Sequence, residues 1–407
     1  MREAHSGEFR RHWPLVAGSS LGLGFGVSMW ATIASLFVLP LSAEFGWTRG
    51  EIAQLSAISL ITALWSPLVG LAADRWGVRP VAILSYVLLG GGYLVATQLT
   101  GSLWSYALLL LAMGFCGIGT TAITWARPIV GTFFVARGLA LALVFAGVSI
   151  SGILVPPLLE AVIAAQGWRS GFVTVAALVW GVGLVAALVI MPRKPITPMA
   201  RAALARAPRQ WGVIFRSPAF WLLFAAMVLV NLGGTGLIGQ LVPMLSDRGL
   251  RSADAALLLS LYAAAILVGR LTTGLLLDRV NPPLVSALAM LVPALGCLML
   301  NEAALGLAYA ALAVVLIGAA QGAETDVLGF MTARYLGQAH YSALMGIYFG
   351  ATLTGNSLGA VLIGRTYDAT GHYTLALWIF AAAFALGAMA FGALRWCRVV
   401  EHRGLPV

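Results

Sequence analysis

The stretch GLAADRWGVRP (residues 70–80) joins an apolar approach to an Asp-Arg pair and a turn containing glycine and arginine. A related stretch, GLLLDRV (274–280), places Asp278 204 residues after Asp74. Each pair follows an apolar segment long enough to cross a membrane as a helix. Similar apolar composition alone would imitate a repeat, but here charged residues align as well. The two stretches therefore predict a chain built from two similar halves.

The composition predicts a membrane protein. The chain has 407 residues, of which 60% are hydrophobic and only 9% are charged, whereas soluble domains carry about 25% charged residues. So few charges cannot cover a surface that faces water, and the lipid bilayer takes that role. The formal net charge of +10 is then explained by basic loops on one side of the membrane rather than by nucleic-acid binding.

Twelve apolar segments are long enough to span the bilayer. They are residues 14–41, 51–72, 79–99, 104–134, 138–164, 170–191, 219–245, 254–277, 282–301, 303–333, 341–365 and 373–394. The polar stretch between the sixth and seventh segments predicts three parts. These are an N-terminal six-helix half (1–192), a cytoplasmic linker (193–218) and a C-terminal six-helix half (219–407).

The distribution of basic residues predicts the orientation. If the N-terminus lies inside, 17 of the 24 Lys and Arg residues fall in inner loops and tails and 5 fall on the outer side. This bias is typical of multi-pass proteins. We therefore expect a protein of the cell inner (plasma) membrane with both termini in the cytoplasm, and its first apolar segment as a retained helix.

The signature at residues 70–80 resembles the loop that follows the second helix in the major facilitator superfamily. The resemblance implies an all-α membrane protein with twelve transmembrane helices in two six-helix pseudo-repeats. It also implies that the Asp-Arg loops form an inner gate, in which Asp74 accepts hydrogen bonds from a neighbouring helix end and the arginines pair across the gate. The expected gating residues are Gly70, Asp74, Arg75, Arg79, Asp278 and Arg279.

A finer resemblance is to the branch that contains the monocarboxylate transporters and the oxalate/formate antiporters. FGWTRGEIA (45–53) is similar to its segment entering helix 2, and GAETDVLGFMTARYLG (322–337) to helix 10 of its bacterial members. Helix 8 of this branch carries an Arg eight residues before the loop acid, as Arg270 precedes Asp278 here. The antiporters carry a Lys in helix 11 and mammalian members one in helix 1; both segments lack Lys here. Oxalate exchange by a two-cation scheme is therefore not expected.

Arg270 is the first candidate for binding a substrate. An ionisable residue at bilayer depth costs at least about 2.5–3.5 kcal/mol and is a functional hypothesis by default. Eight residues at about 1.5 Å each place Arg270 roughly 12 Å above Asp278. Its counterpart in the repeat is Ser66, so the fold does not require the charge. A guanidinium matches a carboxylate bidentately, so we expect an anionic substrate, with a structural ion pair to Glu324 or Asp326 as the alternative.

Three further ionisable residues lie within the predicted spans. Arg127 is one candidate for a second cation that binds the substrate or belongs to the gate. The alternative is an arginine of the inner leaflet whose side chain extends toward the interface. Glu324 and Asp326 lie about 200° apart around a helix, so only one of them faces a given cavity squarely. A carboxylate in this setting can carry a proton, which makes the pair a candidate for proton coupling, and a permanent ion pair with Arg270 or Arg127 is the alternative.

Polar and aromatic residues of the apolar segments complete the candidate site. Asn231, Asn356 and Ser28 are expected to hydrogen-bond a substrate, and Trp30 and Tyr348 to wall an apolar pocket; helix packing is the alternative for all five. The sequence has no phosphate-binding glycine loop and no cluster of metal ligands, so neither ATP nor another cofactor nor a metal is expected, and the chain is not expected to be an enzyme.

These features together predict a secondary transporter of a small organic anion, a monocarboxylate, that works by alternating access with proton coupling or exchange. The expected partners are a small-molecule carboxylate, protons and the lipid bilayer, without nucleic acid, and the protein is expected to be a monomer. One alternative is an exporter of apolar drugs or metabolites by proton antiport. A second is a membrane receptor or sensor that kept the fold.

Overall fold

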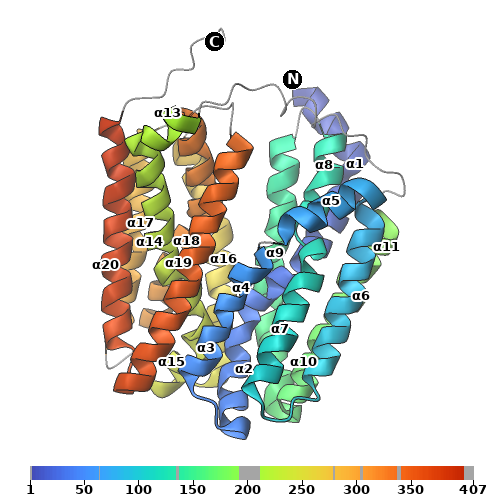
Figure 1. Ribbon diagram of the computed structural model, residues 1–407, viewed down its shortest axis with the longest axis vertical. Coiled ribbons are helices and arrows are strands. Elements are labelled where there is room, and N and C mark those ends of the chain that lie inside the picture. Colours follow the sequence, from blue (N-terminus) through green and yellow to red (C-terminus); the bar gives the residue numbers. More distant parts are fainter. Residues whose placement is uncertain are drawn as a thin grey trace. The chain divides into compact units, whose positions relative to one another are not determined.

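The computed structural model describes residues 2–63, 65–133, 137–191, 211–277, 280–302, 306–336 and 341–397. Within these residues the regular structure is entirely helical (Figure 1). Eleven helical stretches among them are long and apolar enough to cross a membrane. The all-α membrane fold that the resemblance implies is confirmed.

The chain divides into two compact units, and the first consists of residues 1–198 and 251–260. Its α-helices are α1 (Arg2–Gly24), α2 (Trp30–Phe45), α3 (Arg49–Gln54), α4 (Ile58–Ala63), α5 (Ser66–Trp76), α6 (Val78–Ala96), α7 (Leu103–Gly117), α8 (Ala122–Thr132), α9 (Arg137–Gln166), α10 (Trp168–Leu178) and α11 (Val185–Ile190). Short 3₁₀ turns η1 (Val27–Met29), η2 (Leu55–Ala57) and η3 (Ile118–Thr120) and a π-helical turn η4 (Val179–Leu184) connect some of them.

The second unit consists of residues 199–250 and 261–407. Its helices are α13 (Trp211–Arg216), α14 (Pro218–Gly239), α15 (Leu241–Asp247), α16 (Ser252–Leu277, whose first residues belong to the first unit), α17 (Pro282–Met299), α18 (Leu307–Leu336), α19 (Tyr341–Thr370), α20 (Thr374–Ala393) and the 3₁₀ turn η5 (Leu394–Trp396). The expected linker 193–218 lies outside the described residues as far as residue 210.

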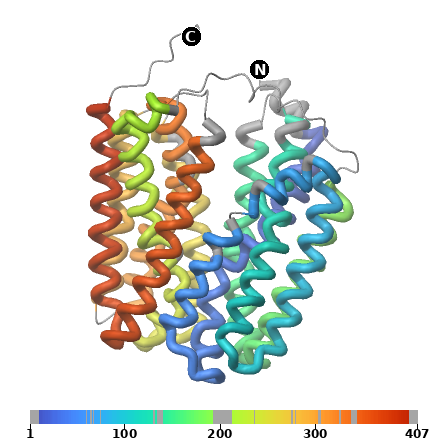
Figure 2. Tube along the Cα trace, in the orientation of Figure 1, coloured from blue at the N-terminus to red at the C-terminus, as the bar shows by residue number. Residues whose placement is uncertain are grey.

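The second predicted span, 51–72, is not one helix. It is divided into α3, η2, α4 and α5, and Figure 2 shows the chain changing direction along it. A capping box of Thr48 and Glu51 starts α3, as expected for a helix N-terminus. At the other end, Gly77 has φ +92° and ends α5 before α6 starts at Val78. A positive φ favours glycine, so the glycine of the signature has a direct structural reason.

Two other predicted spans, 14–41 and 104–134, are also interrupted, and the interruptions meet. The first breaks between α1 and η1, and the second breaks at η3. The backbone N–H of Val27 donates to Thr120 Oγ1 at 2.9 Å, and a Cβ on Gly26 would lie 2.6 Å from the same oxygen. Backbone groups freed by a break inside a membrane need such partners, so the break at η3 supplies an acceptor for a backbone N–H at the break between α1 and α2.

Glycines hold the same pairs of helices together in both units. A Cβ on Gly147 of α9 would lie 1.9 Å from the Ser20 carbonyl of α1, and one on Gly359 of α19 would lie 1.8 Å from the Leu232 carbonyl of α14. Gly359 follows Gly147 by 212 residues, and Leu232 follows Ser20 by the same number. Small residues let membrane helices approach closely, so the internal repeat reappears as a repeated helix contact.

This contact gives a stability prediction. Gly359→Ala places a methyl group where the Leu232 carbonyl lies, so α14 and α19 must separate, and we expect a lower apparent Tm in detergent. Gly350→Ala on the same helix is the matched control, because nothing lies within 4 Å of a Cβ there and alanine favours helix by up to about 1 kcal/mol. Thermal unfolding followed by tryptophan fluorescence measures both; an equal response of the two variants would contradict the packing argument.

Candidate functional site

The buried carboxylate of Glu324 is the centre of the candidate site in the second unit. Glu324 on α18 is only 3% exposed. Asn231 of α14 donates its Nδ2–H to Oε1 at 2.6 Å, and Gln321 donates its Nε2–H to Oε2 at 2.6 Å. The Thr352 hydroxyl of α19 lies 3.5 Å from Oε1. A carboxylate from one helix is thus held by groups from three helices, all of them uncharged.

Asn231 is fixed in place by its surroundings. Its side chain is fully buried, and Nδ2 also donates to the Met227 carbonyl one turn earlier, at 2.9 Å. Across the interface, a Cβ on Gly355 would lie 2.9 Å from the Asn231 Cβ. The structure therefore brings Asn231 to Glu324, a pairing that the sequence did not reveal.

Arg270 lies where α16 crosses α18. A Cβ on Gly269 would lie 2.0 Å from the Ala319 carbonyl, and one on Gly322 would lie 3.0 Å from the backbone nitrogen of Arg270. Arg270 is half-buried. The close approach at these two glycines places the backbone of Arg270 against α18 only two residues before Glu324. Tyr262, about two turns earlier on α16, is within electrostatic range of the Glu324 carboxylate.

The candidate cation of the first unit contacts the signature sequence. Arg127 on α8 is half-buried, and its Nη2 donates to the Gly70 carbonyl of α5 at 3.3 Å. Arg79, at the start of α6, donates to the Leu188 carbonyl of α11, and Arg75 is exposed. The signature thus links α5 to α8 and α6 to α11 within one unit, through arginine donors and backbone carbonyl acceptors.

Several predicted site residues fall outside the description. The side chains of Asp74 and Asp326 are not described, although their backbones belong to α5 and α18, and Asp278 and Arg279 lie outside the described residues altogether. Their assigned roles in gating and proton coupling remain predictions.

The remaining predicted substrate contacts lie in different surroundings. Trp30 stacks on Phe37 and Phe172 with ring centroids 5.6 and 6.0 Å apart, and Ser28 is half-buried in η1. Tyr348 is fully buried, and its hydroxyl donates to the Phe220 carbonyl at 3.3 Å. Asn356 is half-buried.

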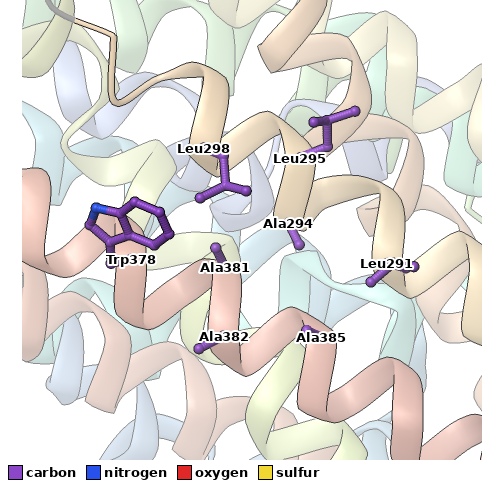
Figure 3. A pocket seen from close by; sticks show the side chains of 8 residues that line it. All are labelled: Leu291, Ala294, Leu295, Leu298, Trp378, Ala381, Ala382 and Ala385. Carbon is purple, nitrogen blue, oxygen red and sulfur yellow. The ribbon is translucent and has the colours of Figure 1, made fainter.

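A groove of about 430 Å³ lies between α17 and α20, away from the charged residues (Figure 3). Its walls are entirely apolar. They are formed by Leu291, Ala294, Leu295, Leu298, Trp378, Ala381, Ala382 and Ala385. Five of these residues are at least one-third exposed, as expected for a surface that faces lipid. The groove therefore offers no polar side chain to a substrate.

Gln321 and Thr352 are site residues that the sequence reasoning missed. Gln321 precedes Glu324 by three residues, a spacing that places both on one helix face, so the sequence did carry a signal for it. Thr352 comes from another helix and has no such signal. Among the described residues, no group of three or more His, Cys, Asp or Glu side chains is placed to hold a metal ion.

Apolar spanning helices, two glycine-packed units and charged groups held inside them define the class as a multi-pass membrane transporter. The model of the Major Facilitator Superfamily matches residues 19–324 and 227–406. The chain belongs to this superfamily, whose members are transporters and not enzymes.

Similar proteins support the family and differ in cargo. Monocarboxylate transporter 13 of Bos taurus is 27% identical over 86% of this chain and 82% of its own length. The Fujikurins efflux protein of Gibberella fujikuroi is 26% identical over 74% of this chain and 64% of its own length. A mutant of the nucleoside transporter NupG shares the fold, with a TM-score of 0.76 at 15% identity over 93% of this chain and 99% of that one. The predicted resemblance to the monocarboxylate transporters is confirmed.

The Asn231–Glu324 contact gives a second prediction. Hydrogen bonds to charged groups contribute about 1.5–3 kcal/mol, against about 0.5–1.5 for neutral pairs. We therefore expect Asn231→Leu to lower the apparent Tm, and to lower it less in a Glu324→Gln background. A double-mutant cycle of thermal unfolding measures the coupling.

The control for this cycle is Asn301→Leu. In the described part of the chain, the side-chain oxygen of Asn301 has no hydrogen-bond partner. Equal losses from Asn231→Leu in both backgrounds would contradict a direct interaction between the amide and the carboxylate.

Proposed function

We propose that this transporter carries a small organic anion, a monocarboxylate, by alternating access with proton coupling or exchange. The observation that carries the proposal is the glycine-tight crossing of α16 and α18, where the backbone of Arg270 lies against Gly322, two residues before the buried Glu324. One group is a permanent cation and the other can bind and release a proton. The similarity to proteins named monocarboxylate transporters supports the same cargo.

In this proposal Arg270 holds the carboxylate of the substrate. The guanidinium group stays charged when buried and offers two parallel N–H donors to a carboxylate. Its half-buried position on α16 lets the same side chain meet a substrate in one state of the cycle and a protein carboxylate in another. The other proposed substrate contacts are Arg127, Asn356, Ser28, Trp30 and Tyr348. Asn231 affects the substrate site through its hydrogen bond to Glu324.

Glu324 is the proposed proton site, together with Asp326. In the described part of the chain, the Glu324 carboxylate contacts two amides and a hydroxyl. These groups are uncharged, so protonation of Glu324 breaks no ion pair with any of them. Carboxylates at such depth commonly serve as proton relays in transporters. Binding of a proton together with an anionic substrate moves no net charge, which suits a symport cycle.

The proposed cycle rocks two halves, 1–192 and 219–407, joined by the linker 193–218. The contact of Arg127 with Gly70 supports a gating role for the signature, because it ties α8 to the start of the Asp-Arg loop. Asp74, Arg75, Arg79, Asp278 and Arg279 complete the proposed inner gate. We propose that the protein is a monomer in the inner (plasma) membrane. Both of its termini then lie in the cytoplasm.

A second candidate function is export of apolar metabolites by proton antiport. The similarity to the Fujikurins efflux protein favours it. In that case Glu324 would still bind protons, but Arg270 would be held permanently by an acidic side chain and would not touch the cargo.

Transport by the purified protein separates the two functions. We expect proteoliposomes to take up labelled C2–C6 monocarboxylates, with faster uptake when the outside is acidic. Arg270→Ala removes the anion-binding group, and we expect uptake to fall by about tenfold or more, corresponding to at least about 1.4 kcal/mol. Arg270→Lys should recover only part of the uptake, because lysine lacks the two parallel N–H donors of a guanidinium group.

The control for charge is Arg395→Ala, which removes an exposed cation at the end of the second unit and should leave uptake unchanged. If no carboxylate is taken up, or if Arg270→Ala transports like the unmodified protein, the anion proposal is wrong.

A further inference from the structure

The three partners of Glu324 differ in what they can do when its charge changes. An amide N–H₂ group only donates, whereas a hydroxyl both donates and accepts. An ionised carboxylate needs donors, and a protonated one needs an acceptor for its own O–H. Of the groups described around Glu324, two are amides and one is a hydroxyl, Thr352.

The Asn231 amide cannot turn round to become an acceptor without loss. Reversing it would direct its oxygen at the Met227 carbonyl, which now accepts from Nδ2 at 2.9 Å. The Gln321 amide, which packs against Gly234 of α14, donates its Nε2–H to Oε2 of Glu324. In this structure both amides therefore act as donors to the carboxylate.

Thr352 differs from the amides in position as well as in chemistry. Its hydroxyl lies 3.5 Å from Oε1 of Glu324, the oxygen that also accepts from Asn231. Asn231 and Glu324 are buried, whereas Thr352 is half-buried on α19. Gln321 is also half-buried, but an amide does not relay protons at ordinary pH. The hydroxyl of Thr352 is thus the group of this set that joins Glu324 to less buried surroundings and is able to pass a proton.

We propose that Thr352 is the positioning residue through which Glu324 gains and loses its proton, an inference that rests on the proposed role of Glu324. To protonate the site, the hydroxyl gives its proton to Oε1 and takes one from a hydronium ion on its outer side, which leaves water. Thr352 is unchanged, Glu324 becomes a neutral acid, and its new O–H then donates to Thr352. Release reverses each step.

Other titratable or charged groups around Glu324 do not take this role. The charge of Glu324 acts on Tyr262 of α16 through space, Arg270 of the same helix carries a guanidinium group rather than a hydroxyl, and the Tyr348 hydroxyl of α19 donates to the Phe220 carbonyl. On α14 the neighbouring contact is the amide of Asn231. Asp326, on the same helix as Glu324, has no described side chain.

The test follows the protonation of Glu324 in the reconstituted protein by infrared spectroscopy after a pH jump. The carboxylic-acid C=O band that disappears in Glu324→Gln reports this residue. Thr352→Val keeps the shape of the side chain and removes the hydroxyl, and we expect the band to respond about tenfold more slowly, since positioned proton-transfer groups commonly contribute that much or more. Thr352→Ala should behave likewise, and Thr352→Ser should recover the rate.

Thr354→Val is the matched control, because Thr354 lies about 200° around the same helix and donates to the Gly350 carbonyl at 2.9 Å. An unchanged rate in Thr352→Val, no recovery in Thr352→Ser, or the absence of a titrating Glu324 band would overturn the inference.

Carboxylate transport is measured on the same preparations. Uptake driven by a proton gradient should slow in Thr352→Val, whereas exchange of labelled for unlabelled carboxylate, which needs no proton release, should not. If the Glu324 band responds slowly in Thr352→Val but no carboxylate is transported, the proposed cargo is wrong and the proposed role of Thr352 still holds.

Discussion

Close approach of helix backbones at glycine is the constraint on which the second unit depends. Gly359 lets α19 reach α14, Gly269 and Gly322 let α16 reach α18, and Gly234 leaves space for the Gln321 amide. Only at such separations can side chains from three helices lie within 2.6–3.5 Å of one carboxylate. Without water inside a membrane, an unsatisfied polar group costs several kcal/mol. The glycines therefore determine whether Glu324 can be tolerated where it lies.

Much of the fold follows from the sequence. The thickness of the bilayer fixes the length of each spanning helix, and the small number of charged residues leaves few other folds possible. The apolar segments and the repeated Asp-Arg loop led to the correct family, and Gly77 marked a turn that requires positive φ. The breaks were not predictable in the same way. A hydropathy pattern averages over about five helical turns, so the interruption between α7 and α8 at residues 118–121, four residues long and uncharged, leaves no mark on it.

The candidate site was predictable in its charges and not in its partners. Arg127, Arg270 and Glu324 stand out in the sequence because charges are rare at bilayer depth. The partners of Glu324 do not, because an asparagine or a threonine in a membrane helix is usually a packing residue. Asn231 is separated from Glu324 by 93 residues, and only the tertiary contact between α14 and α18 reveals that its amide serves the carboxylate rather than an open cavity.

The two units share their packing and differ in their charges, and this difference bears on function. The contact of Gly147 with Ser20 is repeated 212 residues later by Gly359 and Leu232, so the same helix pairs are built in the same way. Yet Ser66 stands in one half where Arg270 stands in the other. A scaffold that folds with serine at that position does not need arginine for stability. Because a cation at membrane depth carries an energetic cost, its presence in one half alone supports the role proposed for Arg270 in transport.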